Sequence, residues 1–161
     1  MQLMLQRRII MKLKLLAALI LAAPLFFANV VNAKNPQDLQ KLLTTWECVK
    51  CNLSGANLSG AHLIGADLRE ANLEGANLNG ANLEGADLTS ANLGGANLTS
   101  AYLTNVNFKQ ANLNAANLTK ATIHDSNVYQ ASMNDLNIAD ADIFYTGIGV
   151  GGEDADIPDW R

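Results

Sequence analysis

The sequence predicts an all-β solenoid, and its repeat pattern is the reason. From residue 51 to residue 145 the chain divides without gaps into 19 blocks of five residues, typified by ANLEG at 71–75. The third position is apolar in all 19 blocks and is Leu in 13 of them. A period of five matches neither the 3.6 residues of an α-helix nor the 2 residues of a strand. In a helix the leucines would advance by about 140° per block and leave no apolar face.

Each block predicts which of its side chains face inward. The first and third positions lie two residues apart, so in a short extended stretch they face the same side, toward the core. The first position is Ala in 15 blocks, because the chain bends close to the axis there, and the third position fills the centre. Gly recurs at the fifth position, where a tight turn favours residues that adopt positive φ. Backbone groups then pair between coils stacked about 4.8 Å apart.

Blocks such as ANLEG, ANLNG and ADLTS resemble the pentapeptide-repeat family, over residues 51–145. The resemblance implies a right-handed quadrilateral β-helix with four repeats per coil, so that residues 20 apart stack on each other. One inner column is then Leu53, Leu73, Leu93, Leu113 and Met133; another is Leu68, Leu88, Phe108 and Val128. We expect looser, wider coils near the C-terminal end, where Ser126 and the bulky Leu136 replace the small first residue. Leu136 is expected to begin plugging that end.

Residues 1–33 have the pattern of a secretory signal peptide. Four basic residues precede an apolar run over 15–27, and Val31 and Ala33 form a cleavage site. Alternatives are an uncleaved N-terminal anchor, a twin-arginine leader, or a true start at Met11. Removing the leader would take 4 of the 11 basic residues and leave 7 against 15 acidic ones, a net charge of −8. Together with the repeats, the leader resembles those of exported family members in cyanobacteria and chloroplast lumens, which implies the periplasm or the thylakoid lumen.

Both ends of a solenoid need covers, because an open end exposes core leucines and unpaired backbone. Residues 34–50 predict a capping helix and linker, with Asn35 as N-cap and the helix over Pro36–Trp46. Its apolar stripe of Leu39, Leu42, Leu43 and Trp46 is expected to lie on the first coil, and a partner-binding helix is the alternative. Residues 146–161 form a Gly-rich acidic tail. Either Ile148, Val150 or Trp160 of this tail folds over the last coil, or the segment is disordered.

Cys48 and Cys51 form the only recognisable chemical motif, a CxxC. Because Cys51 takes an inward position in an exported chain, we expect one structural disulfide that ties the cap to the solenoid. The alternatives are thiol–disulfide redox activity and free or metal-bound thiols. His62 and His124 are expected to be ordinary surface residues. We expect no catalytic residue, metal or cofactor, since a narrow core of Ala and Leu leaves no room for an active site.

The outward positions are the candidate interaction face. An acidic set is expected on neighbouring outer faces of the second and third coils: Asp67, Glu70, Glu74, Glu84 and Asp87. A second set is aromatic: Tyr102, Tyr129, Phe144 and Tyr145. A solvated acidic surface, and aromatic side chains packed under the tail, are the simpler interpretations.

These observations predict a non-enzymatic module that binds an unknown protein as a monomer or weak dimer. The formal net charge of −4 opposes binding to nucleic acid, and the chain has no uncharged apolar run of 18 residues that would favour a membrane span. One alternative is an acidic DNA mimic that acts on a DNA-binding protein, a role that some family members have. The other is a redox protein that uses Cys48 and Cys51.

Overall fold

The computed structural model describes residues 35–146. The signal peptide expected at 1–33 therefore lies outside the described residues, as does the tail after Thr146. Within the described range the elements are the helix α2 (Pro36–Thr45) and the strands β1 (Thr122–His124) and β2 (Asp142–Phe144). Most of the chain between them is a series of bridges and turns that repeats every five residues.

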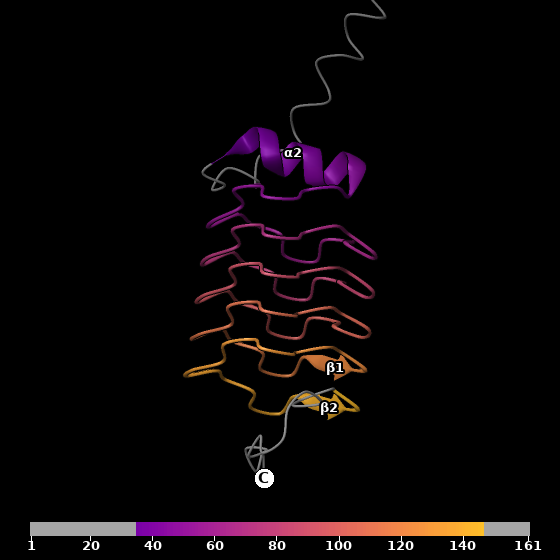
Figure 1. Cartoon of the computed structure of the whole chain (residues 1–161), viewed down its shortest axis with the longest axis vertical. Coiled ribbons are helices and arrows are strands. Elements are labelled where there is room, and N and C mark those ends of the chain that lie inside the picture. The colour runs from indigo at the N-terminus through magenta and orange to yellow at the C-terminus, as the bar shows by residue number, and fades with distance from the viewer. Residues whose placement is uncertain (1–34, 147–161) are drawn as a thin grey trace, which may run out of the picture. The chain divides into compact units, whose positions relative to one another are not determined.

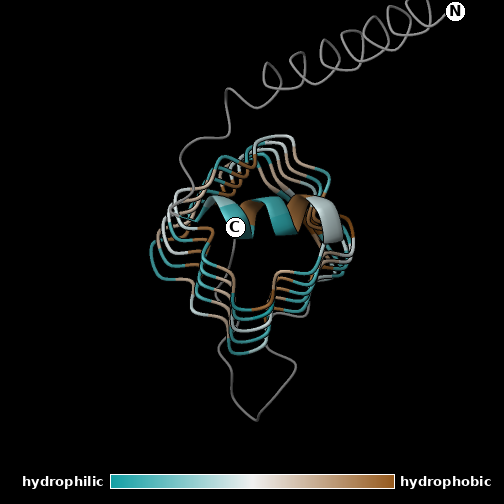
Figure 2. Cartoon of the chain, turned by 90° about the horizontal axis from the view of Figure 1, so that it is seen from above, coloured by the Kyte–Doolittle hydropathy of each residue, from teal (hydrophilic) through white to brown (hydrophobic). Residues whose placement is uncertain are grey.

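The repeats wind into stacked coils of 20 residues. Parallel bridges join residues 20 apart along the whole series, from Glu47 with Asp67 to Asn117 with Asn137. The strands β1 and β2 continue the same register, with Ile123 opposite Ile143. Figure 1 shows the coils one below another, and the view along the stack in Figure 2 shows their four-sided outline. Four blocks of five residues therefore make one turn.

Backbone hydrogen bonds run between coils in a fixed pattern. The Leu53 N–H donates to the Asn72 carbonyl at 2.7 Å, and the Asn72 N–H donates back to the Cys51 carbonyl at 2.8 Å. The N–H of Gly55, at the fifth position, donates to the Glu74 carbonyl at 2.9 Å. A further bond from Ala56 N–H to Leu53 carbonyl, 3.0 Å, closes the turn at the corner. Each side thus donates two hydrogen bonds to the next coil and accepts one from it.

The corner turns explain the residues found at the fifth position. That residue has a positive φ in every block, from 43° at Tyr145 to 68° at Gly85. A turn with positive φ only at its third residue is the type II pattern, which favours Gly and Asn. No Val, Ile or Thr occupies the fifth position of any of the 19 blocks, and β-branched side chains are the ones that positive φ penalises most.

The Asn or Asp at the second position stabilises the turn that follows it, a role that was not predicted from the sequence. The Asn97 Oδ1 accepts a hydrogen bond from the Thr99 N–H at 3.1 Å, and the same contact recurs at Asn72 and Glu74. These are Asx turns, which satisfy a backbone donor left free by the corner. Asn amide groups also bond between coils, as from Asn112 to Asn92 at 2.8 Å.

The inward positions form a continuous apolar core. Leu53, Leu73, Leu93 and Leu113 are buried in one column, and Leu68, Leu88 and Phe108 are buried in another. Met133 and Val128, the last members of these columns, are only half-buried because no described coil covers them. Ser126 differs from the expectation that it loosens the coil. It is buried, donates to the Leu103 carbonyl and accepts from the Val106 N–H, so its hydroxyl is satisfied.

The helix α2 begins as expected and ends earlier than expected. The Asn35 side chain accepts hydrogen bonds from the N–H groups of Gln37 and Asp38, which makes it the N-cap. Leu39 and Leu42 are buried. The helix stops at Thr45 because Trp46 adopts a left-handed conformation with φ 56°, its N–H bonding to the Leu42 carbonyl.

The expected packing of Leu43 and Trp46 is wrong, since both side chains are exposed. Leu43 lies about 100° around the helix from Leu42, at the flank of the buried stripe. Trp46 has left the helical path altogether. It begins a block, residues 46–50, that already pairs with the coil below through Glu47 and Asp67. The solenoid pairing therefore starts before residue 51.

Asp38 links the helix to the first repeat. Its Oδ2 accepts hydrogen bonds from the Asn52 backbone N–H at 2.8 Å and from the Asn35 amide at 2.9 Å. We predict that Asp38→Ala lowers the free energy of unfolding by about 1–3 kcal/mol, because two donors lose a charged acceptor. Asp38→Asn, which keeps an acceptor oxygen, should lose less than half of that. Urea denaturation followed by circular dichroism measures both, and equal losses would contradict the bridging role.

Candidate interaction surface

Because residues 20 apart stack, the outer surface of the coil divides into four sides. We name two of them. The aromatic side comprises residues 61–65, 81–85, 101–105, 121–125 and 141–145. The acidic side comprises residues 46–50, 66–70, 86–90, 106–110 and 126–130. Outward side chains of one block therefore face the same way as those of every fourth block after it.

The exposed large hydrophobic side chains of the described coil are not spread evenly over these sides. Between residues 51 and 146 they are Ile64, Tyr102, Phe144 and Tyr145, with exposed fractions of 55%, 56%, 55% and 76%. All four belong to the aromatic side. The remaining exposed hydrophobic residues, Leu43, Trp46 and Val49, belong to the N-terminal helix and the block that follows it. One side of the coil thus has an apolar character that the others lack.

The C-terminal end of the aromatic side holds a compact cluster. The rings of Phe144 and Tyr145 meet edge-on with centroids 4.1 Å apart, and the His124 ring lies 6.0 Å from that of Phe144. The His124 Nε2 is 3.0 Å from the Asp142 Oδ2. The register of β1 and β2 creates this cluster, since it sets His124 beside Phe144. The pairing of His124 was not predicted from the sequence, although the spacing of 18 residues to Asp142 could have indicated it.

Tyr129 does not join this cluster. It lies on the acidic side, is half-buried, and has the Lys109 ammonium 6.0 Å from its ring centroid. A cation at that distance over an aromatic face is a weak favourable contact. Of the four aromatic residues expected at the surface, the structure therefore places Tyr102, Phe144 and Tyr145 on one side and Tyr129 on the next.

The carboxylates of the acidic side are largely paired. The Arg69 guanidinium binds Asp67 through two hydrogen bonds, of 2.8 Å from Nε and 2.6 Å from a terminal nitrogen, and lies 4.0 Å from Asp87. The Lys50 ammonium lies 3.5 Å from Glu70. The hydrogen bonds from Arg69 lower the pKa of Asp67 below its usual value. Three of the five expected acidic residues thus share this side with two cations.

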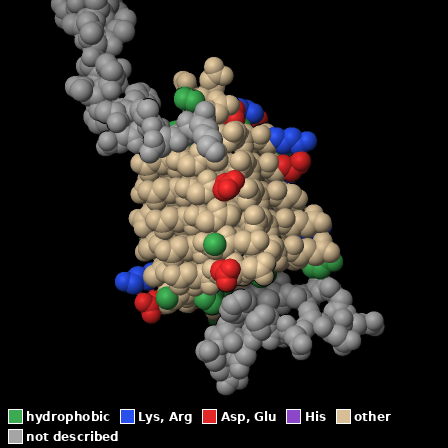
Figure 3. Space-filling view, turned by 90° about the vertical axis from the view of Figure 1, so that its left-hand side faces the viewer, with side chains coloured by type: hydrophobic (Ala, Val, Ile, Leu, Met, Phe, Trp, Pro, Cys, Tyr) green, Lys and Arg blue, Asp and Glu red, His purple; other side chains and the backbone are tan. Residues whose placement is uncertain are grey.

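The other two acidic residues lie elsewhere. Glu84 is on the aromatic side, and Glu74 is on the side formed by residues 71–75 and their stacked equivalents. The structure does not bring the acidic set together on one surface. Figure 3 views one side of the molecule and shows a surface of backbone and neutral polar side chains, with charged groups scattered among them.

Cys48 and Cys51 are joined by a disulfide. Both are buried, because Cys48 takes the third position of the block 46–50 and Cys51 the first position of the next block. The Cys48 Sγ lies 3.3 Å from the Asp38 carbonyl oxygen in α2. This is a packing contact, since a disulfide sulfur has no proton to donate. The bridge therefore lies under the helix at the start of the coil.

Residues 35–146 contain no group of three or more His, Cys, Asp or Glu side chains that could hold a metal ion. His62 and His124 both belong to the aromatic side, but their blocks are three coils apart in the stack. In the same range no helix is long and apolar enough to cross a membrane.

Comparison with known proteins agrees with this geometry. The family model described as pentapeptide repeats matches residues 51–89, 66–105 and 96–135 in overlapping segments that together span more than half of the chain. The chain therefore belongs to the pentapeptide-repeat family, whose fold is a right-handed quadrilateral β-helix. Members of this family are mostly non-enzymatic proteins that act in protein–protein interaction. The comparison with curated proteins gave no significant match.

Solved structures of the same family are similar to the chain. A pentapeptide repeat protein from the Arabidopsis thaliana thylakoid lumen is 33% identical with a TM-score of 0.55, over 62% of this chain and 66% of that one. The chain thus spans about two thirds of that structure. A protein of the cyanobacterium Cyanothece is 27% identical with a TM-score of 0.33, over 66% and 93% of the two chains. A Nostoc protein involved in heterocyst differentiation regulation is 24% identical with a TM-score of 0.26, over 56% and 60%.

Proposed function

We propose that the chain is an exported, non-enzymatic module that binds a partner protein through its aromatic side. The observation that carries this proposal is the distribution of exposed hydrophobic side chains. Ile64, Tyr102, Phe144 and Tyr145 all lie on one side of a coil whose remaining surface is polar. Aromatic side chains on a rigid support are typical anchors of protein interfaces, because they bury a large apolar area at a small cost in conformational entropy.

The coil suits this role because its backbone fixes the spacing of the anchors. Stacked residues are about 4.8 Å apart, so Ile64 and Phe144, four coils apart, are separated by about 19 Å. Tyr102 lies between them, two coils from each of the levels that they occupy. A partner surface roughly 20 Å long would therefore meet all of these side chains at once, which is within the size of a standard interface.

The acidic residues have less support as the contact surface. A phosphate mimic needs an unbroken row of negative charge. On the acidic side, Arg69 pairs with Asp67 and lies beside Asp87, and Lys50 pairs with Glu70. We propose that Glu84, on the aromatic side, contributes a polar rim contact, and that the other carboxylates act as solvated surface groups.

For the disulfide, we propose a structural role. Thiol–disulfide exchange requires a sulfur that an external thiolate can reach. Cys48 and Cys51 are both buried under α2, and the contact of Cys48 with the Asp38 carbonyl adds to their cover. The disulfide then holds the block 46–50 against the first full repeat. An oxidising compartment, either periplasm or thylakoid lumen, is consistent with this bridge.

The test compares two tyrosines on different sides. We predict that a photoreactive p-benzoylphenylalanine replacing Tyr102 gives a discrete cross-linked adduct in the exported compartment, whereas the same residue replacing Tyr129 gives none. Both positions originally carry Tyr and both lie in the same half of the coil, so the variants are matched. Mass spectrometry of the Tyr102 adduct identifies the partner.

Affinity for the identified partner gives the quantitative prediction. Tyr102→Ser should weaken binding about tenfold, since an aromatic anchor contributes at least about 1.4 kcal/mol. Tyr129→Ser should change it less than twofold. Equal adducts from both positions, or equal losses of affinity, would show that the aromatic side is not the contact surface.

A further inference from the structure

The C-terminal end of the described coil is open. In every earlier coil the N–H groups of the third and fifth positions donate to the next coil, as from Phe108 to Asn127. Within residues 35–146, the equivalent groups of Met133, Ile138 and Ile143 have no backbone acceptor. The core side chains of this last coil are half-buried, whereas those above them are buried.

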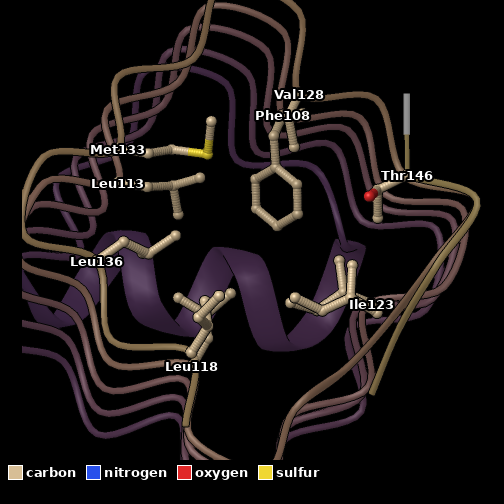
Figure 4. Close-up of a pocket in the computed structure, with 10 residues that line it drawn as sticks. Phe108, Leu113, Leu118, Ile123, Val128, Met133, Leu136 and Thr146 are labelled. Carbon is tan, nitrogen blue, oxygen red and sulfur yellow. The ribbon is translucent and has the colours of Figure 1, made fainter. Parts of the chain in front are cut away.

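An apolar cavity of about 40 Å³ lies at this end. It is lined by Phe108, Leu113, Leu118, Ile123, Val128, Met133, Leu136, Ile138, Ile143 and Thr146. Figure 4 shows Leu136 and Met133 on one wall, Ile123 and Thr146 across from them, and Phe108 between the two walls. Leu136 thus occupies part of the end, as expected, and leaves the centre uncovered. Apolar surface of this kind requires a cover.

The sequence after Thr146 has the composition of such a cover. Thr146 takes the first position of a further block, 146–150, and Ile148 takes its third position, in the column of Phe108 and Val128. Val150 then falls at the fifth position, where the described blocks never carry a β-branched residue. The block pattern therefore stops at Val150, and the remaining eleven residues are not repeats.

We propose that residues 147–161 close the C-terminal end of the coil, with Ile148 filling the cavity beside Val128 and Trp160 lying across its mouth. Thr146 already lines the cavity, so the segment starts at its edge. The chain from Gly151 to Trp160 can extend about 33 Å, roughly twice the length of one five-residue side. Trp160 can therefore reach the centre from the corner where the block ends. Closure of this end does not depend on the proposed binding role of the aromatic side.

The fluorescence of Trp160 tests the proposal. The chain has 2 Trp, so Trp46→Phe in the full chain leaves Trp160 as the only one, and Trp46 is exposed. We expect a blue-shifted emission and a rate of acrylamide quenching several-fold lower than in the same variant unfolded in urea. Adding Ile148→Asp should raise the quenching rate several-fold, because a carboxylate does not enter an apolar cavity. The matched Asp154→Asn should leave the rate unchanged. Equal rates in these two variants would overturn the placement of Ile148.

A second measurement keeps the proposal testable if the Trp46→Phe variant does not fold. Trp160→Ser should lower the Tm by about 5 °C, and the matched Asp159→Ser should leave it within 1 °C. Light scattering separates the two occupants. Trp160 protected in a monomer supports closure by the chain's own tail. Protection that is lost when a dimer dissociates on dilution would overturn it in favour of a second copy, and quenching as fast as in urea would overturn it altogether.

Discussion

Leu93→Asp is expected to leave the chain unfolded. Leu93 is completely buried in the middle of the inner column, between Leu73 and Leu113. A carboxylate there has no cation or hydrogen-bond donor of the core to pair with, since its neighbours are Ala and Leu. The loss of apolar burial and the cost of an unpaired charge together exceed about 5 kcal/mol, a large part of the stability of a domain of this size. Circular dichroism and size-exclusion chromatography will detect the unfolding.

Ala115→Asp is the matched control. It introduces the same residue at an exposed fifth position, where Ala115 has φ 56°. Asp tolerates positive φ better than Ala does, and Asp already occupies three equivalent corners, at positions 125, 135 and 140. The variant should therefore unfold within about 0.5 kcal/mol of the original chain. Similar damage from both substitutions would show that the third position does not face the core.

Phe108→Ala is expected to cost about 3–5 kcal/mol of unfolding free energy. Phe108 is the only aromatic residue at a third position and is buried. Its ring also lines the cavity at the C-terminal end, so its removal enlarges a space that is already present. The core cannot collapse to fill that space, because the coil backbone is fixed by hydrogen bonds on both sides, such as the one from Phe108 N–H to Asn127.

Phe108→Leu separates the effect of the cavity from that of the aromatic ring. Leu is the residue that most blocks carry at this position, so the backbone accepts it without strain. We expect a loss of about 1 kcal/mol, because most of the apolar volume is kept. Urea denaturation with an unchanged m-value will measure both variants. A loss for Phe108→Leu as large as that for Phe108→Ala would contradict packing as the cause.

Much of this fold follows from the period alone. The five-residue repeat determines the inward positions, and the frequent Gly indicates positive φ at the fifth, where the structure also has Glu70, Lys120 and Tyr145. The helix start at Asn35 follows from its capping residues. These features are local, so a short stretch of sequence contains the physical reason for each of them.

Features that depend on contacts between distant segments were harder to predict. Arg69 pairs with Asp67, and this removes charge from the surface that the carboxylates suggested. Ile64 was overlooked because its outward position looks unremarkable until it is compared with Phe144, 80 residues later on the same side. When the outward residues are sorted by every fourth block, the aromatic side can be recognised from the amino-acid sequence alone.

The 20-residue turn has a consequence for how such a chain changes length. Inserting one five-residue repeat preserves every hydrogen bond in the ladder but rotates all later residues by a quarter turn. An insertion between Ile64 and Tyr102 would therefore break the single stripe into two that point in perpendicular directions. Growth by whole turns keeps surface features aligned, whereas growth by single repeats moves them around the axis.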